Sequence, residues 1–375
     1  PELVEKEQLI KKVISNEELN FNKTIDQGLN LLNSLIKEGG VLSGEDAFRL
    51  YDTFGFPLDL TKDILSEKNM TVDEQGFAEL MEKQRELART SRKAADAESW
   101  KSDGISFDDV SKTDFLGYTE NNCSAKVLDI VCDGEHTESV TAGQKAIVVL
   151  DRTVFYGESG GQVGDNGALV GKDKIFTVSD TKKTAGGVVT HLGTLDKGIL
   201  SVGDTVIAEI NTARRDAIRR NHTAAHLLQA ALRKVLGTHV EQAGQLVNEF
   251  AVRFDFTHFS ALSAEEIAQV EEFVNKAILD GIDIENTEMP IEEAKKLGAM
   301  ALFGEKYGNI VRVVNIPGRS VELCGGTHAA NTAKLGLFKI ISEASVAAGV
   351  RRIEAVTGFE VLKLIDGYKN SLLKT

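Results

Sequence analysis

Apolar residues recur at helical spacing through the first hundred positions. One stripe repeats at intervals of three and four and predicts an amphipathic helix: Phe21, Ile25, Leu29, Leu32 and Ile36. Ser43, Asp59 and Asp73 each precede a further apolar run and are candidate N-caps. We therefore expect a helical region over residues 1–100, with a small, polar linker from Ala94 to Gly104.

The pattern changes between residues 101 and 211, where short apolar runs alternate with Gly, Asp and Asn. Turn residues recur about every ten positions, a spacing that favours a small β-barrel or β-sandwich. The expected strands lie at 125–131, 146–150, 175–178, 188–192 and 206–210.

Helix and strand patterns mix in residues 212–375. A long helix is expected from about Ala213 to Leu236, with Gly237 ending it. Ser263 and Glu266 match the capping-box pattern of a second helix. Further strands are expected at 250–256, 310–316, 320–323, 337–341 and 350–356, and a terminal helix at 359–373. This mixture predicts a two-layer sandwich, and the whole chain is expected to be an α+β protein in three parts.

Composition and charge narrow the possible partners. The chain has 375 residues, of which 42% are apolar, yet no stretch approaches the length of a membrane span. Asp and Glu outnumber Lys and Arg by 57 to 43, which argues against binding nucleic acid through overall positive charge but leaves room for a local basic strip. The three cysteines are too few for a disulfide framework, so we expect a reducing, cytoplasmic compartment.

Two short motifs offer metal ligands. His222 and His226 stand four residues apart on a predicted helix, so both imidazoles face the same way. Cys324 and His328 flank a Gly-Gly-Thr turn just after a predicted strand. Together they form a ligand set suited to one tetrahedral Zn²⁺ per chain. Core or surface histidines are the alternative interpretation, which the paired spacing makes the weaker one.

The role of the metal stays open at this point. Position 223 is Thr, so the glutamate that serves as general base in zinc peptidases is absent. Four protein ligands are typical of structural zinc, whereas catalytic zinc keeps an open position. Either one ligand leaves, or the ion holds the site together while other groups orient the water.

A glycine-rich segment runs from Gly157 to Gly167 and matches neither the P-loop nor the dinucleotide fingerprint. It is either a tight hairpin of the barrel or a backbone lip over a substrate, in which case Gly160 and Gly161 would contact that substrate together with Thr223. An arginine run on the helix that carries the histidine pair is either a phosphate-binding strip or a solvated face. That run comprises Arg214, Arg215, Arg219 and Arg220.

With these motifs in hand, the chain resembles the alanyl-tRNA synthetases over almost its whole length. Four segments carry the resemblance: Phe48–Thr61, Phe155-Tyr-Gly-Glu-Ser-Gly-Gly-Gln162, the His222/His226 and Cys324/His328 pairs, and Arg351–Gly358. The two metal motifs alone would also fit threonyl-tRNA synthetase editing domains and free-standing alanyl-tRNA editing proteins. The combination in this order is specific.

The resemblance implies a function for each part. Residues 1–100 resemble the end of the helical region that recognises the acceptor stem of tRNA(Ala). Residues 101–211 resemble a barrel similar to the second domain of elongation factor Tu, and residues 212–375 resemble the editing core. That core hydrolyses mischarged Ser-tRNA(Ala) and Gly-tRNA(Ala) at the 3′ end. The aminoacylation domain with its ATP and Mg²⁺ is expected upstream of Pro1, and a C-terminal region that allows oligomers beyond Thr375.

The resemblance also assigns roles to single residues. The zinc set is His222, His226, Cys324 and His328, and Gln242 matches a glutamine implicated in editing. Asp52 is the best match to the acid that reads the G·U pair of the acceptor stem. We expect the basic end of the same helical region to contact the stem through Arg85, Arg89, Arg92 and Lys93, with an ordinary solvated helix end as the alternative interpretation.

Two other functions compete with zinc-dependent editing. The zinc is structural in the first, and the chain is an RNA-binding module that does not hydrolyse on its own. In the second, the chain is a free-standing trans-editing deacylase, which the helical first hundred residues argue against.

Overall fold

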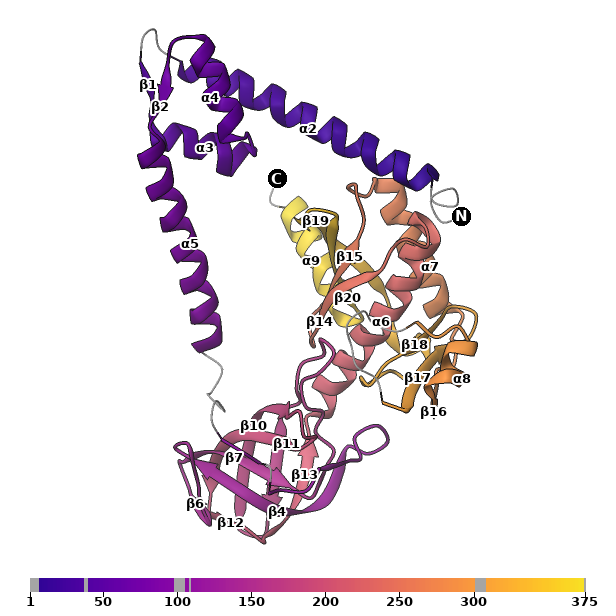
Figure 1. The fold of residues 1–375 in the computed structure, drawn as a ribbon. Helices are drawn as coiled ribbons and strands as arrows, with labels where there is room; N and C mark the ends of the chain where they lie inside the picture. The colour runs from indigo at the N-terminus through magenta and orange to yellow at the C-terminus, as the bar shows by residue number, and fades with distance from the viewer. Residues whose placement is uncertain (1–6, 37–39, 98–104, 108, 301–307, 374–375) are drawn as a thin grey trace. The chain divides into compact units, whose positions relative to one another are not determined.

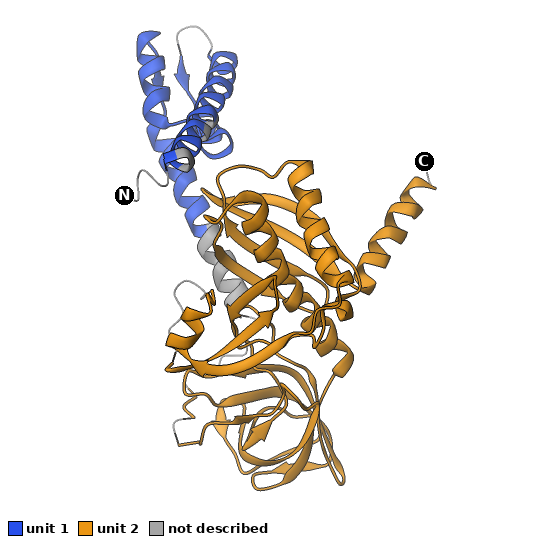
Figure 2. Ribbon diagram, turned by 90° about the vertical axis from the view of Figure 1, so that its right-hand side faces the viewer, with its two compact units in different colours: residues 1–104 blue, residues 105–375 orange. Residues whose placement is uncertain are grey.

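A computed structural model describes residues 7–36, 40–97, 105–107, 109–300 and 308–373, without the helix side chains of residues 8, 9, 16, 20 and 87–97. The chain divides into two compact units, residues 1–104 and residues 105–375 (Figure 2). The expected barrel and the sandwich that follows it both fall in the second unit.

The first unit is helical. Its described elements are α2 (Glu7–Leu35), α3 (Gly44–Phe54), α4 (Leu58–Glu67), α5 (Glu74–Ala97), and the short parallel strands β1 (Val41–Leu42) and β2 (Thr71–Val72). Leu32, Leu50, Phe56 and Leu65 are fully buried and form the centre of its core. The apolar stripe of the sequence therefore faces this core in its second half, whereas Phe21 is exposed.

Caps explain where these helices begin and end. Ser43 Oγ accepts a hydrogen bond from Asp46 N at 3.1 Å, and Gly55 ends α3 in the left-handed conformation with φ of 65°. Asp73 caps α5 by accepting from Gly76 N at 2.9 Å. The prediction of Asp59 as an N-cap was wrong, because Pro57 holds that position and Asp59 lies in the first turn of α4. The predicted linker begins inside α5, and residues 98–104 lie outside the described residues.

The second unit opens with a closed β-barrel (Figure 1). Its strands are β4 (Asn122–Cys132), β7 (Lys145–Leu150), β9 (Gly167–Gly171), β10 (Lys174–Lys183), β11 (Val189–Lys197) and β13 (Thr205–Ile210). They pair in the order β13-β9-β10-β11-β7-β4, and β13 closes the ring by pairing with β4. All five strands expected from the sequence are present, and β9 was not expected.

Every second side chain along the barrel strands points inward, and these side chains fill the interior of the barrel. Val206, Ala208 and Ile210 of β13 are buried while their neighbours are exposed, as expected for strands with one face inward. Phe155 and Phe176 are fully buried in the same core. Five short strands accompany the barrel. β5 (Glu135–His136) pairs with the end of β4, and two separate two-stranded sheets are formed by β3 (Asp114–Phe115) with β8 (Arg152–Thr153) and by β6 (Ser139–Thr141) with β12 (Ile199–Ser201).

Two antiparallel sheets and their helices follow the barrel, which confirms the α+β prediction. One sheet has the order β14-β15-β20-β19 and the other β16-β17-β18. The strands are β14 (Gln242–Val247), β15 (Val252–Thr257), β16 (Glu285–Pro290), β17 (Ile310–Ile316), β18 (Ser320–Leu323), β19 (Phe338–Ala347) and β20 (Val350–Thr357). The helices are α6 (Thr212–Leu236), α7 (Ala264–Leu279), α8 (Ile291–Lys296), η1 (Thr332–Leu335) and α9 (Phe359–Leu372).

Helix α6 is the central element of this part. It packs against α7, against β14, β15 and β20 of the larger sheet, and against β18 of the smaller one. Asn211 caps its start and Gly237 ends it, as the sequence predicted for the glycine. The capping box of α7 is also confirmed, with Ser263 and Glu266 bonding each other's backbone N–H. Because α6 contacts both sheets, a side chain on it can meet residues from either.

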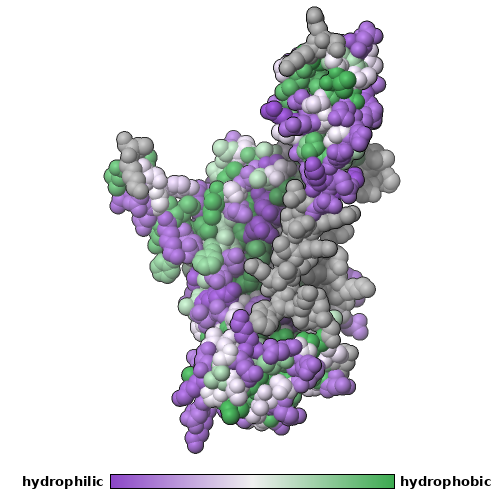
Figure 3. Space-filling view, turned by 90° about the vertical axis from the view of Figure 1, so that its left-hand side faces the viewer, coloured by the Kyte–Doolittle hydropathy of each residue, from purple (hydrophilic) through white to green (hydrophobic). Residues whose placement is uncertain are grey.

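Helix α9 exposes a row of apolar side chains. Phe359, Leu362, Ile365 and Tyr368 are each about half exposed or more, and hydrophobic surface is visible on this helix in Figure 3. None of the described helices combines the length and apolar character that a membrane span needs.

Candidate metal centre and the cavity beside it

Four side chains from two distant parts of the chain converge in the second unit. His222 and His226 come from α6, and Cys324 and His328 come from the loop after β18. Their ligand atoms all lie within 4.8 Å of one another. Cys324 Sγ lies 3.5 Å from His222 Nε2 and 3.3 Å from His328 Nε2. The structure therefore brings together all four residues predicted as a metal set.

The geometry fits zinc. In a tetrahedral site with Zn–N near 2.0 Å and Zn–S near 2.3 Å, neighbouring ligand atoms lie roughly 3.3–3.8 Å apart. The two sulfur–nitrogen distances given above agree with that range, and the whole set of ligand atoms spreads over up to 4.8 Å. Helix α6 supplies two imidazoles, and the loop after β18 supplies a thiolate and a third imidazole. These are donor types that zinc favours.

Burial keeps the three imidazoles in the form that binds metal. It lowers the pKa of His226 to about 3 and lowers the pKa of His222 and His328 well below their usual range. The nearby positive charge of Arg312 acts in the same direction. All three are consequently neutral at pH 7 and can offer a lone pair.

Gln162 orients the first histidine. Its Oε1 lies 2.8 Å from His222 Nδ1 and also accepts a hydrogen bond from Thr327 N at 2.9 Å. Gln162 is fully buried and comes from the glycine-rich segment. A hydrogen bond to one ring nitrogen of a histidine fixes which of the two nitrogens is left to bind a metal. Sequence reasoning did not identify this role, because nothing distinguishes Gln162 from the other polar residues of the segment.

Thr223 orients a different histidine. Its Oγ1 lies 3.2 Å from His328 Nδ1 and accepts from Ala329 N at 3.1 Å. The prediction that Thr223 contacts the substrate was wrong, because the side chain is completely buried on the inner face of α6. Its hydroxyl holds a metal ligand instead.

The third histidine faces a buried carboxylate. His226 Nδ1 has no hydrogen-bond partner among the described residues and lies 3.6 Å from Glu322 Oε2. Burial raises the pKa of Glu322 to about 7, and Ser320 Oγ donates to its Oε1 at 2.6 Å. A carboxylate behind a histidine is a common arrangement around zinc, and Glu322 holds that position behind His226.

A tyrosine of the barrel and an arginine of β17 hold the loop that carries Cys324. Tyr118 Oη donates to Gly325 O at 2.7 Å, and Arg312 Nη1 donates to Cys324 O at 2.8 Å and Gly326 O at 3.0 Å. The guanidinium also lies over the Tyr118 ring, 4.2 Å from its centre. These contacts fix the backbone on both sides of Gly325 and join the barrel to the metal loop.

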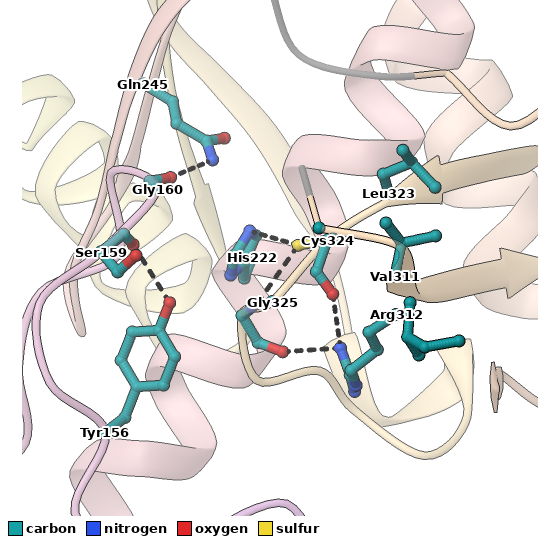
Figure 4. A pocket seen from close by; sticks show the side chains of 13 residues that line it. Tyr156, Ser159, Gly160, His222, Gln245, Val311, Arg312, Leu323, Cys324 and Gly325 are labelled. Atoms are coloured by element: carbon teal, nitrogen blue, oxygen red, sulfur yellow. Dashed lines mark hydrogen bonds between the residues drawn. The ribbon is translucent and has the colours of Figure 1, made fainter. Parts of the chain in front are cut away.

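A cavity of about 260 Å³ opens beside the metal cluster (Figure 4). His222 and Cys324 form one wall, and the glycine-rich segment forms another through Ser159 and Gly160. Tyr156 donates to Ser159 O at 3.1 Å, and burial raises the pKa of its hydroxyl so that it remains protonated. No carboxylate is among the described residues that line this cavity.

The glycine-rich segment forms a loop between the barrel and the larger sheet. Gly160 and Gly161 have φ of 58° and 79°, a backbone conformation that favours glycine. Gly160 lines the cavity, whereas Gly161 packs against β14, where its carbonyl accepts from Val247 N at 2.7 Å. Of the two glycines expected at a substrate, only Gly160 is in a position to meet one directly.

Gln242 and Gln245 lie on the same strand but differ in position. Gln245 lines the cavity and donates to Gly160 O at 2.7 Å. Gln242 is at the start of β14 and is not among the lining residues. A catalytic role for Gln242 stays a prediction, and Gln245 is the glutamine that the structure brings to the cavity.

The arginine run of α6 is mostly engaged by protein groups. Arg214 pairs with Glu249 at 2.9 Å, and Arg219 pairs with Asp216 at 3.1 Å. Arg215 is fully buried in an ion pair with Asp165. The prediction of Arg215 as a tRNA contact was therefore wrong, because no phosphate can reach its guanidinium. Arg220 is half-buried and lies against Gly358.

The residues expected to contact the acceptor stem lie in the first unit. Asp52 is exposed on α3 and accepts a hydrogen bond from Gln84 of α5. Arg85 is exposed on α5, where it pairs with Glu82 at 3.5 Å. The side chains of Arg89, Arg92 and Lys93 lie outside the described residues.

Comparison with known proteins agrees with these features. A family model described as tRNA synthetases class II (A) matches residues 1–214, and one described as the threonyl and alanyl tRNA synthetase second additional domain matches residues 311–354. The second match covers Cys324 and His328.

Curated relatives are similar over nearly the whole chain. An alanine–tRNA ligase of Clostridioides difficile is 51% identical over 98% of the chain, and alanine–tRNA ligase 1 of Lachnoclostridium phytofermentans is 50% identical over 99%. The relative from Bacillus velezensis is 47% identical over 96%. The chain spans 43% of the length of the first two relatives and 41% of the third. Because the class II model alone matches more than half of the residues, the chain belongs to the alanyl-tRNA synthetase family.

Proposed function

We propose that this chain removes wrong amino acids from tRNA(Ala) by hydrolysing Ser-tRNA(Ala) and Gly-tRNA(Ala). The observation that carries the proposal is the cluster of His222, His226, Cys324 and His328, two members of which, His222 and Cys324, line a small cavity. The parent protein would attach alanine to tRNA(Ala) with ATP and Mg²⁺, because the relatives are named alanine–tRNA ligases. No residue of this chain is proposed for that chemistry.

The selectivity of an alanine-binding pocket against glycine and serine has a physical limit, which a second, hydrolytic site can overcome. A pocket that accepts alanine cannot strongly reject glycine, which is smaller by one methyl group, and serine adds only a hydroxyl. Differences of this kind are worth about 1–3 kcal/mol, which leaves frequent errors. Hydrolysis of the wrong ester at a separate site removes them after the first reaction.

The proposed reaction is attack of water on the ester carbonyl, after which the bond to the ribose oxygen breaks and the amino acid leaves as an acid. A bound zinc would supply Lewis acidity at that carbonyl or hold the substrate in place. Gly160 and Ser159 would border the amino acid on the opposite side of the cavity from the metal cluster. The protonated Tyr156 hydroxyl helps hold that side in shape through Ser159 O.

Recognition of the tRNA is proposed for both units. In the first unit, Asp52 and Arg85 are exposed and so are available to an acceptor stem, and Arg89, Arg92 and Lys93 are proposed alongside them. In the second unit, Arg214, Arg219 and Arg220 remain candidates for phosphate contacts near the metal cluster. An oligomer of the parent protein is compatible with this proposal and is not required by it.

A purely structural metal is the second candidate function. It is favoured by a full set of four protein donors and by the lack of a carboxylate among the described cavity residues. In that case the chain binds tRNA(Ala) and hydrolyses nothing by itself. A free-standing deacylase would need no helical region like the one that the structure shows in residues 7–97.

The first prediction tests hydrolysis and metal together. The zinc-loaded chain should release serine from Ser-tRNA(Ala) without ATP, and Cys324→Ala should lose bound zinc and hydrolysis in parallel. Zinc content is measured by atomic emission and hydrolysis by the remaining charged tRNA. Cys132→Ala is the matched control, because Cys132 lies in the barrel outside the cluster, and it should retain both.

Each outcome separates the two candidate functions. Tight tRNA binding with intact ester at saturating zinc would support the structural metal and refute hydrolysis by this chain. A zinc-free Cys324→Ala protein that still hydrolyses the ester would show that the metal is dispensable.

A further inference from the structure

The loop that carries two of the four metal-ligand candidates has little rigidity of its own. It places Gly325 and Gly326 between Cys324 and His328, and glycine has more conformational freedom to lose than any other residue. The two histidines of α6, by contrast, belong to a 25-residue helix and are buried in it. The loop half of the cluster must therefore be held by groups outside the loop if its donors are to be in place before a metal binds.

Three successive carbonyl groups of this loop accept hydrogen bonds from two side chains outside it. Arg312 Nη1 donates to Cys324 O at 2.8 Å and to Gly326 O at 3.0 Å. Between these two, Tyr118 Oη donates to Gly325 O at 2.7 Å. Figure 4 shows the Arg312 side chain reaching the backbone of the loop. The loop backbone is consequently held at each residue from the first ligand candidate to Gly326.

The guanidinium of Arg312 is itself fixed. It lies over the Tyr118 ring, 4.2 Å from its centre, and its Nη2 donates to Asn286 Oδ1 of β16 at 2.8 Å. The backbone carbonyl of Arg312 accepts from Cys324 N at 3.0 Å, so β17 runs directly beside the first ligand candidate. The Tyr118 ring stands edge-on to Phe115, with 4.9 Å between the ring centres. The side chains that hold the loop are thus held by the barrel and by the smaller sheet.

The charge of Arg312 does not explain its place beside a cation site. Burial is the main cause of the low pKa of the three imidazoles, and the positive charge of Arg312 lowers the pKa of each further. The same charge repels a dication. Its hydrogen-bond acceptors within the described part of the chain are neutral, two carbonyls of the loop and one amide. The planar fork of arginine, which can hold both carbonyls and stack on an aromatic ring, is the property that this position uses.

We propose that Tyr118 and Arg312 are positioning residues for the metal, which hold the loop in its ligand geometry before the ion binds and so raise the affinity of the cluster for Zn²⁺. The inference rests on the metal centre of the proposed function and does not require that an ester is hydrolysed. It gives the barrel a part in metal binding through Tyr118. Because coupling between two sites is reciprocal, a bound metal also strengthens the attachment of the barrel to the loop.

The test measures the zinc affinity of the full chain by competition with a chromophoric chelator. Arg312→Lys keeps the positive charge but loses the fork and the stacking. It should raise the Kd for Zn²⁺ about 10- to 100-fold, the usual effect of removing a group that holds a metal ligand. Tyr118→Phe loses only the hydrogen bond to Gly325 O and should raise Kd about 2- to 10-fold. Because both residues hold one loop, the double variant should raise Kd by less than the product of the two single effects.

Arg319→Lys is the matched control. Arg319 lies in the turn of the β17–β18 hairpin, at the opposite end from the metal loop. Its guanidinium lies over the Phe273 ring, 5.1 Å from its centre, and pairs with Asp280 at 2.7 Å. The variant therefore removes a fork and a stacking contact from the same hairpin without touching the loop, and Kd should stay at the wild-type value.

A second measurement needs no metal and separates a loosened loop from a misfolded protein. In the zinc-free chain, amide hydrogen exchange over residues 323–329 should be faster in Arg312→Lys and in Tyr118→Phe than in the wild type. Exchange in α6 should stay unchanged, because its hydrogen bonds do not depend on the loop. A faster exchange confined to the loop shows that the two side chains hold it before the metal arrives.

Two results would overturn the inference. One is wild-type Kd together with wild-type exchange of the loop in both variants, and the other is an equal rise of Kd in Arg312→Lys and Arg319→Lys. Failure of the proposed function would appear differently. Zinc affinity would then depend on Tyr118 and Arg312 as expected, while the zinc-loaded chain leaves Ser-tRNA(Ala) intact.

Discussion

At the metal cluster, the close approach of the histidine pair on α6 and the Cys-Gly-Gly-Thr-His motif limits which residue types fit. A methyl group added to Gly326 would lie 2.0 Å from His222 Cε1, so no other residue fits there without moving a ligand. The second Gly of the Cys-Gly-Gly-Thr-His motif thus has a packing reason. The spacing of the motif predicted the donor atoms, but neither Gln162 nor Glu322 could be assigned to a histidine from the sequence, because those pairs are distant along the chain.

The barrel contains a buried histidine whose protonation is linked to stability. His191 is fully buried, with Nδ1 3.0 Å from Val148 O and Nε2 2.8 Å from Thr153 Oγ1. Burial lowers its pKa from 6.5 to about 4. As pH falls below 6.5, the unfolded chain takes up the proton first, so the stability contributed by the neutral imidazole is full above 6.5 and is lost towards pH 4.

We therefore predict that His191 makes the protein less stable in mild acid. Between pH 7.5 and pH 5 its contribution should fall by about 2 kcal/mol. The free energy of unfolding in urea should decline less over this interval in His191→Gln than in the wild type. Parallel curves for wild type and His191→Gln would contradict the prediction.

At the scale of elements, α6 joins the barrel to the sheets through one buried side chain. Arg215 Nε donates to Asp165 Oδ1 at 3.0 Å, Nη1 to Gly117 O at 2.8 Å and Nη2 to Val154 O at 2.9 Å. All three partners belong to the barrel or to the segments that enter it. The same helix carries His222 two turns later, so the position of the metal ligands depends on this attachment.

We predict that loss of this attachment is costly. Arg215→Met leaves Asp165 buried and unpaired and should destabilise the protein by about 3–5 kcal/mol. The measurement is the urea midpoint together with near-UV circular dichroism. Arg214→Met, a change in a less buried neighbour, should cost about 1 kcal/mol or less, and adding Asp165→Asn to Arg215→Met should recover part of the loss. Equal effects of the two single changes would argue against a special role for Arg215.

The elements differed in how well the sequence predicted them. Helices α6 and α7 and the alternating strands of the barrel were predicted because cap residues and regular apolar spacing are local signals. Strand β16 was missed, since most of its side chains are exposed and no alternation marks it. The arginine run was misjudged at Arg215 for a related reason. Burial on α6 comes from the barrel as well as from the sheets, so the apolar spacing of the helix does not show it.

At the scale of the whole molecule, the chain has two compact units, and all four metal-ligand candidates lie in the second. A ligand stabilises only the unit whose folded form binds it. The two units should therefore respond differently to removal of zinc, whatever role the metal has in the reaction.

We predict two thermal transitions in calorimetry, of which only one depends on zinc. At free zinc of about 100 times Kd, chelation should lower that transition by about 5–10 °C. Leu50→Ala, in the core of the first unit, should lower the other transition and leave the zinc-dependent one in place. A chelator that moves both transitions equally, or neither, would contradict this division.

The distance in sequence between the two metal motifs has a consequence for synthesis. The strands of the barrel end at Ile210, before α6 begins, whereas Cys324 follows His222 by 102 residues. At translation rates of about 5–20 residues per second, that interval lasts roughly 5–20 s. A nascent chain can therefore fold its barrel before the strands that cover the apolar faces of α6 have been synthesised. Capture of the metal has to wait for His328, and β20, which packs on α6, is made later still. The ribosome-bound chain therefore needs protection from aggregation at α6 more than at any barrel strand.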